Sequence, residues 1–341
     1  MTKFNPPIYP AAVEIGGASI KLLQLKRGAQ GPCEVFKTAY LPLNNNKDSS
    51  AQIKDSLAAL IRDNQIHGSI ITSLPLSKIH SFTFIFPNMP EKDIEQAVAW
   101  KLKQNLPAGL VLDGISFDYL WSLSSGDNLN GEMVVLIFAV PKKTVLERIG
   151  LFDKFPVKVI AVEPGPYAAL RALHFLKKIS PQETILVLAL GSSESSITVV
   201  RRGSMCLIRP LTVSGNGLTQ AIANYHKIDF LKAEGIKRSE GLKTGGSLCR
   251  PAVSSQLEGL IVDLEHTFKF FSHQLMKSQE PASYDRAILC GGPAAMAGLD
   301  KFLAEKLGVP VEVFNPLGGA EENAHSFAAA MGMAIRYASN E

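Results

Sequence analysis

One short pattern occurs twice in this chain, about half its length apart, and it restricts the folds that the chain can adopt. The copies lie at residues 13–22 and 188–197. Each contains an apolar run, a turn of small residues led by glycine, and a second apolar run, which together predict a β-hairpin. Strands and helices are expected in the same order after both hairpins. The sequence therefore predicts an α/β unit that is duplicated to give two lobes.

The turn of the first hairpin has the chemistry of an anion-binding surface. It consists of Gly16, Gly17, Ala18 and Ser19, and Lys21 follows on the next strand. Glycine lets the turn adopt positive φ and lets a ligand approach the main chain, while outward amides and hydroxyls attract anions. A phosphate grip is favoured over a plain tight turn, whereas Lys21 is equally well explained as a solvated strand residue.

The second hairpin has a similar turn but lacks one charged group. Its turn begins with Gly191, Ser192 and Ser193, so the two hairpins together are suited to hold a polyphosphate from both sides. Two residues before the first glycine, copy one has Glu14 and copy two has Ala189. Only one hairpin therefore carries a carboxylate on its first strand, and this difference bears on whether a bound polyphosphate is hydrolysed.

The composition excludes several classes of protein. With 341 residues, of which 46% are hydrophobic and 19% charged, the chain is globular and long enough for two cores. Its net charge of +4 comes with scattered basic pairs and no interleaved aromatic residues, so nucleic acid is not an expected partner. The four cysteines are far apart and lack C-x-x-C spacing, which argues against a disulfide framework or a zinc site.

No segment has the features of a membrane anchor. The apolar run at 134–140 is far shorter than the roughly 20 residues that a membrane-spanning helix needs. The first residues lack the apolar centre of a signal peptide. We therefore expect a cytoplasmic protein that reaches a membrane only through a partner.

The first half of the chain is predicted to contain a small inserted subdomain. Residues 81–155 show the order β-α-β-β-α, with a helix that starts at Glu91 and ends before Pro107. In the second half, a turn at 214–217 is expected to precede a helix from Leu218, and apolar spacing over 257–275 predicts one long helix.

The expected division of the chain follows from these segments. The first lobe comprises residues 1–80 and 156–180 together with a C-terminal helix within 324–341. The insert comprises residues 81–155, and the second lobe comprises residues 181–323 with its own inserted part at 216–283.

An ordered set of motifs extends over roughly 320 residues. Its members are Glu14 to Lys21, Pro87 to Ile94, Val162 to Pro164, Gly215 to Thr219, Ala233-Glu234 with Lys237-Arg238, Leu289 to Gly292, Leu307 to Val311, and Ala328 to Arg336. Each motif alone is weak, but the ordered set resembles the PilM family of type IV pilus assembly proteins, which are actin-like ATPases allied to the cell-division protein FtsA. The resemblance implies an α/β, actin-like (ribonuclease H-like) duplicated two-lobe fold with a small inserted α+β subdomain in the first lobe.

The resemblance also implies ATP and Mg²⁺ as cofactors. It puts Glu234 and Lys237 near ribose and adenine, although their i, i+3 spacing also fits a surface ion pair. Gly291 and Gly292 lie between a strand end and a helix start, where a nucleotide can approach the main chain. The remaining predicted contacts with the nucleotide are Gly215 and Gly217, which serve either the same pocket or a turn.

Hydrolysis is expected to be slow or absent. The family places an aspartate on the first strand of each phosphate hairpin to hold Mg²⁺ through water, whereas this chain has Glu14 and Ala189. Glutamate displaces the carboxylate by about 1 Å, and errors of that size can cost ~100-fold in rate. Glu14 and Glu163 are the catalytic candidates. Glu14 is also the candidate for Mg²⁺ through water, Glu163 is the candidate that orients water, and Glu194 is a partial substitute for the missing acid.

By resemblance, the chain is a nucleotide-binding scaffold at the cytoplasmic face of the inner membrane. Its expected partners are the N-terminal peptide of a PilN-like inner-membrane protein, which would lie between the first lobe and the insert, and other pilus assembly proteins. The alternatives are an active actin-like ATPase that drives pilus assembly and a small-molecule kinase of the same superfamily, for which the insert has no convincing sugar pocket.

Overall fold

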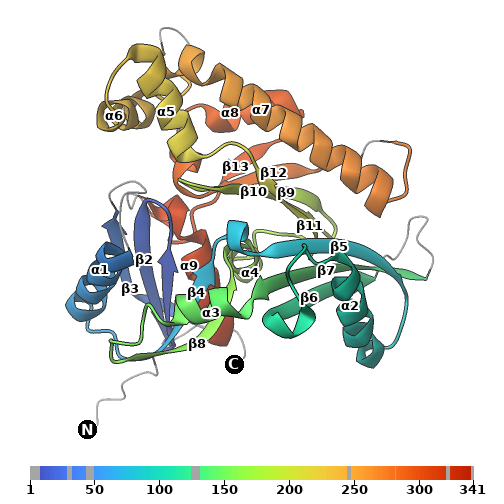
Figure 1. Cartoon of the computed structure of the whole chain (residues 1–341). Helices are drawn as coiled ribbons and strands as arrows, with labels where there is room; N and C mark the ends of the chain where they lie inside the picture. The colour runs from blue at the N-terminus through green and yellow to red at the C-terminus, as the bar shows by residue number, and fades with distance from the viewer. Residues whose placement is uncertain are drawn as a thin grey trace.

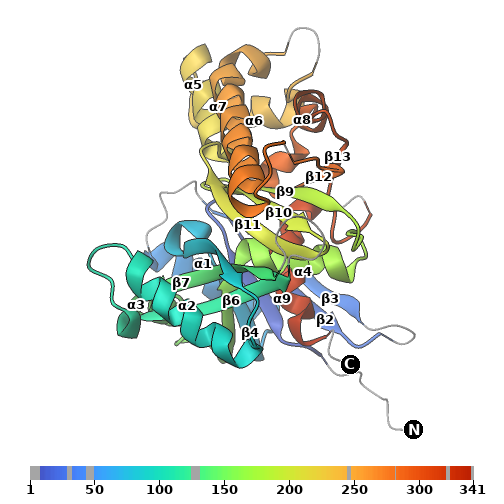
Figure 2. The ribbon, with the colours of Figure 1, turned by 90° about the vertical axis from the view of Figure 1, so that its right-hand side faces the viewer.

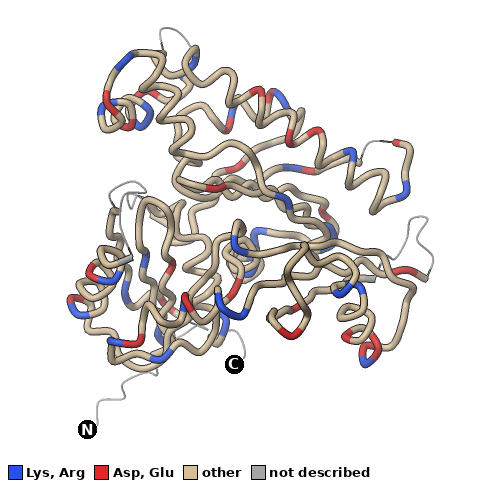
Figure 3. Tube along the Cα trace, viewed as in Figure 1, with Lys and Arg blue, Asp and Glu red and all other residues tan. Residues whose placement is uncertain are grey.

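Three β-sheets organise the chain, as the computed structural model shows (Figure 1). The structure describes residues 8–28, 33–43, 50–123, 131–243, 247–280, 282–319 and 323–338. The sequence also predicts loops at 44–50 and 124–131, and most of these two segments lies outside the described ranges. Basic and acidic residues alternate along the trace without forming a face of one sign in this view (Figure 3). Among the described residues, no helix combines the length and apolar character that crossing a bilayer requires.

The first lobe is built on a five-stranded sheet with the order β3-β2-β1-β4-β8. Strands β1 and β2 form the predicted antiparallel hairpin, and β4 pairs in parallel with both β1 and β8. Helix α1 packs its apolar side chains on one face of this sheet. The bounds are β1 (Ala11–Ile15), β2 (Ser19–Lys26), β3 (Glu34–Pro42), α1 (Ser50–Asp63), β4 (Gly68–Leu74) and β8 (Val157–Pro164).

The second lobe repeats this arrangement with the order β11-β10-β9-β12-β13. Its hairpin is antiparallel, and β12 pairs in parallel with both β9 and β13, so each sheet has the same topology. The predicted duplication is thereby confirmed. The bounds are β9 (Thr184–Leu190), β10 (Ser195–Arg201), β11 (Ser204–Leu211), β12 (Arg286–Cys290) and β13 (Val311–Val313).

The helices of the second lobe cover the outer side of its sheet (Figure 1). One prediction was wrong here, because the helix expected from Leu218 begins three residues earlier. Ser214 is its N-cap, and its hydroxyl accepts the amide N–H of Gly217 at 3.2 Å, so the expected turn is the first turn of the helix. The bounds are α5 (Gly215–His226), α6 (Phe230–Glu240), α7 (Cys249–Phe270), which continues as a π-helical turn (Phe271–Leu275), and α8 (Leu299–Leu307).

The insert has the predicted β-α-β-β-α order and its own antiparallel sheet, β5-β7-β6. One face of this sheet packs against α2 around Ile94, Val98 and Leu102. The other face lies beside β11 of the second lobe (Figure 2), so the insert contacts both lobes. The bounds are β5 (His80–Pro87), α2 (Glu91–Asn105), β6 (Ile115–Leu123), β7 (Glu132–Pro141) and α3 (Lys142–Ile149).

Two helices rich in small residues lie between the sheets of the two lobes. They are α4 (Gly165–Phe175) and α9 (Ala328–Ala334). A β-carbon on Gly332 would lie 1.6 Å from the carbonyl oxygen of Ala168, so the helices are in backbone contact at this point. The C-terminal helix predicted within 324–341 is divided, because 3₁₀ turns (Ala324–Phe327 and Ile335–Tyr337) flank α9.

Candidate functional site

A cleft of about 1040 Å³ lies between the two lobes, where both hairpin turns meet the end of β12. Its walls come from both halves of the chain, as expected for a duplicated fold with one central site. The predicted site residues that line it are Glu14, Gly16, Gly17, Ala18, Ser19, Lys21, Gly191, Ser192, Ser193, Gly215, Glu234, Lys237, Gly291 and Gly292. Two other predicted residues, Gly217 and Glu163, are not part of the lining.

The two hairpin turns have the same backbone geometry. In the first, the amide N–H of Gly16 donates to the carbonyl of Ser19 at 2.9 Å. In the second, the amide N–H of Gly191 donates to the carbonyl of Glu194 at 3.0 Å. Both turns therefore close over the same number of residues and present their small side chains to the cleft.

The tips of the hairpins touch across the cleft. A β-carbon on Gly17 would lie 1.9 Å from the hydroxyl oxygen of Ser193 and 2.8 Å from that of Ser192. A side chain at this position would meet the serine side chains of the opposite turn, which would have to move to accept it. The arrangement places the main chain of one lobe against hydroxyl groups of the other. Both can donate hydrogen bonds to phosphate oxygens.

Glu14 and Lys21 are cross-strand partners in the first hairpin and form an ion pair of 2.9 Å. Lys21 is buried, so the alternative of a solvated strand residue does not hold. Only one oxygen of the Glu14 carboxylate takes part in this pair. The other, Oε2, is buried and has no hydrogen-bond partner in the structure. The first hairpin thus presents an unused acceptor at the cleft.

The matching position in the second hairpin carries no charge. Ala189 is paired with Ser196 on one side and with Cys290 on the other. Burial raises the pKa of the Cys290 thiol to about 12, and the Glu14 carboxylate acts in the same direction, so this thiol is neutral. Among the described residues, no three His, Cys, Asp or Glu side chains converge as a metal-binding group.

Glu194 does not replace the missing acid, because its carboxylate is bound elsewhere. The carboxylate accepts the amide N–H groups of Leu76 at 2.7 Å and Ser77 at 3.0 Å. These amides belong to a 3₁₀ turn (Leu76–Lys78) of the first lobe. Glu194 therefore links the second hairpin to the opposite lobe, an interaction that sequence reasoning missed.

Glu163 lies outside the cleft lining and is held by two arginines. Its oxygens accept from Arg171 at 2.9 and 2.8 Å and from Arg336 at 2.9 Å. The carboxylate side chain is only 3% exposed. In this position Glu163 fastens β8 to α4 and to the C-terminal segment.

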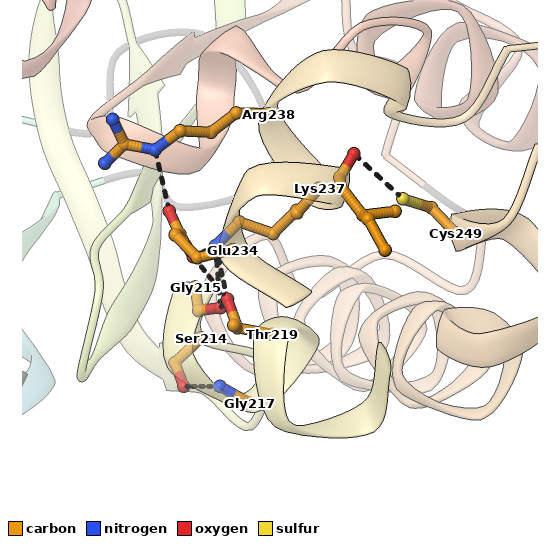
Figure 4. Close-up of polar contacts among 9 residues, drawn as sticks. Ser214, Gly215, Gly217, Thr219, Glu234, Lys237, Arg238 and Cys249 are labelled. Carbon is orange, nitrogen blue, oxygen red and sulfur yellow. Dashed lines mark hydrogen bonds and ion pairs between the residues drawn. The ribbon is translucent and has the colours of Figure 1, made fainter. Parts of the chain in front are cut away.

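Glu234 and Lys237 form part of a partly buried network on the wall made by α5 and α6 (Figure 4). The Lys237 ammonium donates to Glu234 at 2.6 Å, to the Thr219 hydroxyl at 2.6 Å and to the Gly215 carbonyl at 3.1 Å. Arg238 donates to the second Glu234 oxygen at 2.9 Å. Because Lys237 is buried, the alternative of a surface ion pair does not describe it.

The pKa values of this pair follow from burial and from each other. Burial lowers the pKa of Lys237, although the Glu234 carboxylate opposes this effect. Burial alone would raise the pKa of Glu234, but Lys237 and the hydrogen bonds bring that pKa below its ordinary value. The carboxylate is therefore ionised, and it holds α5 and α6 together at the cleft.

Gly291 and Gly292 serve different purposes at the end of β12. Gly291 has φ of 93°, and a β-carbon there would lie 2.0 Å from the carbonyl oxygen of Leu190, so only glycine fits. A β-carbon on Gly292 would meet nothing within 4 Å, although the residue lines the cleft. Gly292 thus leaves space open for a ligand, whereas Gly291 permits the strand to turn.

Sequence reasoning missed two further basic side chains of the lining, Arg148 and His325. Burial lowers the pKa of His325, whose carbonyl accepts the amide N–H of Gly291 at 3.0 Å. Neither residue belongs to one of the sequence motifs, so no local signal identifies it. Only the fold brings Arg148, from the insert, into the same cleft as the hairpins.

The two facing hairpin-led sheets and the cleft between them define an actin-like fold. Solved structures of that fold match the whole chain at low identity. MreB 5 of Spiroplasma citri bound to AMPPNP has a TM-score of 0.52 at 12% identity, with 99% of this chain and 98% of that chain covered. The ethanolamine utilization protein EutJ from Carboxydothermus hydrogenoformans has a TM-score of 0.52 at 15% identity, with 97% and 90% covered.

The chain belongs to the family of type IV pilus assembly protein PilM, whose sequence profile matches residues 12–337. A solved structure described as a PilM-PilN type IV pilus biogenesis complex has a TM-score of 0.79 at 24% identity. That comparison covers 96% of this chain and 98% of the other. The resemblance inferred from the ordered motifs is confirmed.

Proposed function

We propose that this protein is a nucleotide-binding scaffold of a type IV pilus assembly machine that hydrolyses its nucleotide slowly or not at all. The observation that carries the proposal is a cleft lined by two phosphate-type turns of which only one has a carboxylate on its first strand. ATP is the proposed ligand, since MreB 5, with the same fold, has been solved with AMPPNP bound.

The residues of the cleft fit Mg²⁺ bound together with a nucleotide. Mg²⁺ usually keeps several waters and takes one or two protein carboxylates along with substrate phosphates. The free, buried Oε2 of Glu14 is the oxygen that would accept from a metal-bound water. When bound, the ion would neutralise phosphate charge, while Lys21 and the amides of the two turns hold the phosphates in place.

Slow turnover follows from how the cleft carboxylates are used. Phosphoryl transfer depends on positioning and on stabilising developing charge. Glu14 is tied to Lys21, Glu194 to two backbone amides, and Ala189 has no acid at all. Since Glu163 is held by Arg171 and Arg336, the free Oε2 of Glu14 is the one cleft acceptor left among these carboxylates, and we assign it to metal-bound water rather than to an attacking water.

The proposed partner is the N-terminal peptide of a PilN-like inner-membrane protein. The solved complex of similar fold is described as containing PilM and PilN. We expect the peptide between the first lobe and the insert, at the cytoplasmic face of the inner membrane, with other pilus proteins around it. Because the insert contacts both lobes, a change in the angle between the lobes would alter the space between the first lobe and the insert where the peptide is expected. A coupling free energy of about 1–3 kcal/mol between nucleotide binding and peptide binding is enough for regulation.

Calorimetry tests the proposal with two ligands, the nucleotide and the partner peptide. Mg·ATP is titrated into the protein first, and a synthetic peptide of the partner's N-terminus is then titrated with and without nucleotide. We expect both to bind and the peptide Kd to change roughly 5- to 150-fold with nucleotide, the range that such coupling gives. A peptide of scrambled sequence is the control, and absence of heat in both titrations would overturn the scaffold proposal.

A further inference from the structure

Arg148 is a cleft residue contributed by the helix at the end of the insert. It lies on α3 (Lys142–Ile149) and shares the cleft lining with Glu14, Gly16 and Ser19. Figure 1 shows α3 beside the first lobe, and α5 and α6 in the second lobe. Its guanidinium nitrogen Nη1 is buried and has no hydrogen-bond partner in the structure.

No acid of the described cleft lining pairs with this guanidinium in the structure. Each acid of the lining is engaged by other groups: Glu14 by Lys21, Glu194 by two backbone amides, and Glu234 by Lys237 and Arg238. Burial lowers the pKa of Arg148, and no neighbouring acid opposes this effect.

Arg171, which like Arg148 is half-buried, shows how the same chain treats such an arginine when its role is structural. Burial also lowers the pKa of Arg171, but the hydrogen bonds and charge of Glu163 more than offset this, so its pKa lies above the ordinary value. A buried charge without a partner is unfavourable, because it has lost water and gained no counter-charge. An anion from outside the protein would remove that penalty at Arg148.

Two unpartnered polar atoms of the described cleft lining are complementary. Glu14 Oε2 is an acceptor suited to metal-bound water, and Arg148 Nη1 is a donor suited to a phosphate oxygen. We propose that Arg148 binds the terminal phosphate of a nucleoside triphosphate and thereby reports to the insert whether the triphosphate or the diphosphate is bound. This inference rests on the proposed function. The terminal phosphate is the group concerned because α5 and α6, in the second lobe, form the wall expected for ribose and adenine.

The test compares the affinities of the whole chain for AMPPNP and ADP, both with Mg²⁺, in the wild type and in Arg148→Met. Methionine keeps much of the buried volume and removes the charge. We expect the wild type to favour AMPPNP, and Arg148→Met to lose on the order of tenfold in AMPPNP affinity while keeping its ADP affinity, as for one charge-assisted hydrogen bond. Lys142→Met is the matched control, since Lys142 is an exposed cation of the same helix outside the lining.

The outcomes separate this inference from the proposed function. An AMPPNP-to-ADP ratio that is unchanged in Arg148→Met, or equal losses for both nucleotides, would overturn the role of Arg148. A wild type that binds both nucleotides equally well would do the same and leave the scaffold proposal intact. A wild type that binds neither nucleotide removes the scaffold proposal itself.

Discussion

Gly332→Ala is expected to lower the free energy of unfolding by about 3 kcal/mol, at the upper end of the range for overpacked sites. The new β-carbon would lie 1.6 Å from the carbonyl oxygen of Ala168, and the obstacle is backbone rather than a flexible side chain. Helices α4 and α9 would have to separate, and they join the two lobes. Urea unfolding followed by circular dichroism measures the loss directly.

Gly165→Ala is the matched control at the same pair of helices. A β-carbon on Gly165 would lie 4.0 Å from the β-carbon of Ala329, which is an ordinary contact. This variant should remain within about 0.5 kcal/mol of the wild type. Equal unfolding curves for the two variants would show that close packing at Gly332 does not hold the helices together.

Gly292→Val is expected to abolish nucleotide binding without unfolding the protein. The added side chain meets nothing within 4 Å at its β-carbon, so it should be tolerated, but it projects from a residue of the cleft lining. Filling the space where a ligand approaches the main chain should weaken Mg·ATP binding at least ~100-fold. Calorimetry gives the affinity, and the thermal unfolding midpoint checks the fold.

Gly235→Val controls for the introduction of valine itself. Gly235 is an exposed residue of α6 outside the cleft lining, and a β-carbon there would also meet nothing within 4 Å. We expect this variant to bind Mg·ATP as the wild type does. If Gly292→Val retains wild-type affinity with an unchanged unfolding midpoint, the nucleotide does not occupy this part of the cleft.

The elements with a local signal can be predicted from the sequence. Both hairpins are predicted correctly because alternating apolar runs and glycine-led turns lie within ten residues of each other. The order of elements in the insert is predictable for the same reason. The start of α5 is misplaced because Ser214-Gly215 serves equally as a turn signal and as an N-cap, and only the Ser214 hydrogen bond decides between them.

The pairing of the charged residues cannot be predicted in this way, because it depends on contacts between distant parts of the chain. Glu194 meets an amide 118 residues away, and Glu163 meets Arg336 across 173 residues. By sequence both are candidates for chemistry in the cleft, yet their carboxylates connect segments of the fold. Arg148 escapes prediction for the same reason, since nothing in its own helix points to the cleft.

The asymmetry of the two hairpins is the central feature of the site. The first provides an ion-paired Glu14 with one unused oxygen. The second provides Ala189 and Ser196, and the neighbouring residue on β12 is the neutral Cys290, so none of the three carries charge. A cleft of this kind is suited to hold a polyphosphate, and it lacks the second acid that would help to cleave it. Nucleotide binding would then change the angle between the lobes and the position of the insert, and hydrolysis of the nucleotide would not be needed.

The most direct test is the chemical fate of bound nucleotide. The wild type and Glu14→Gln are incubated with stoichiometric Mg·ATP, and the nucleotide retained by the protein and the phosphate released are both quantified over time. We predict that the wild type retains intact ATP and that phosphate appears at the same background rate in both proteins. Phosphate release that is faster in the wild type than in Glu14→Gln, with ADP recovered from the protein, would contradict the account.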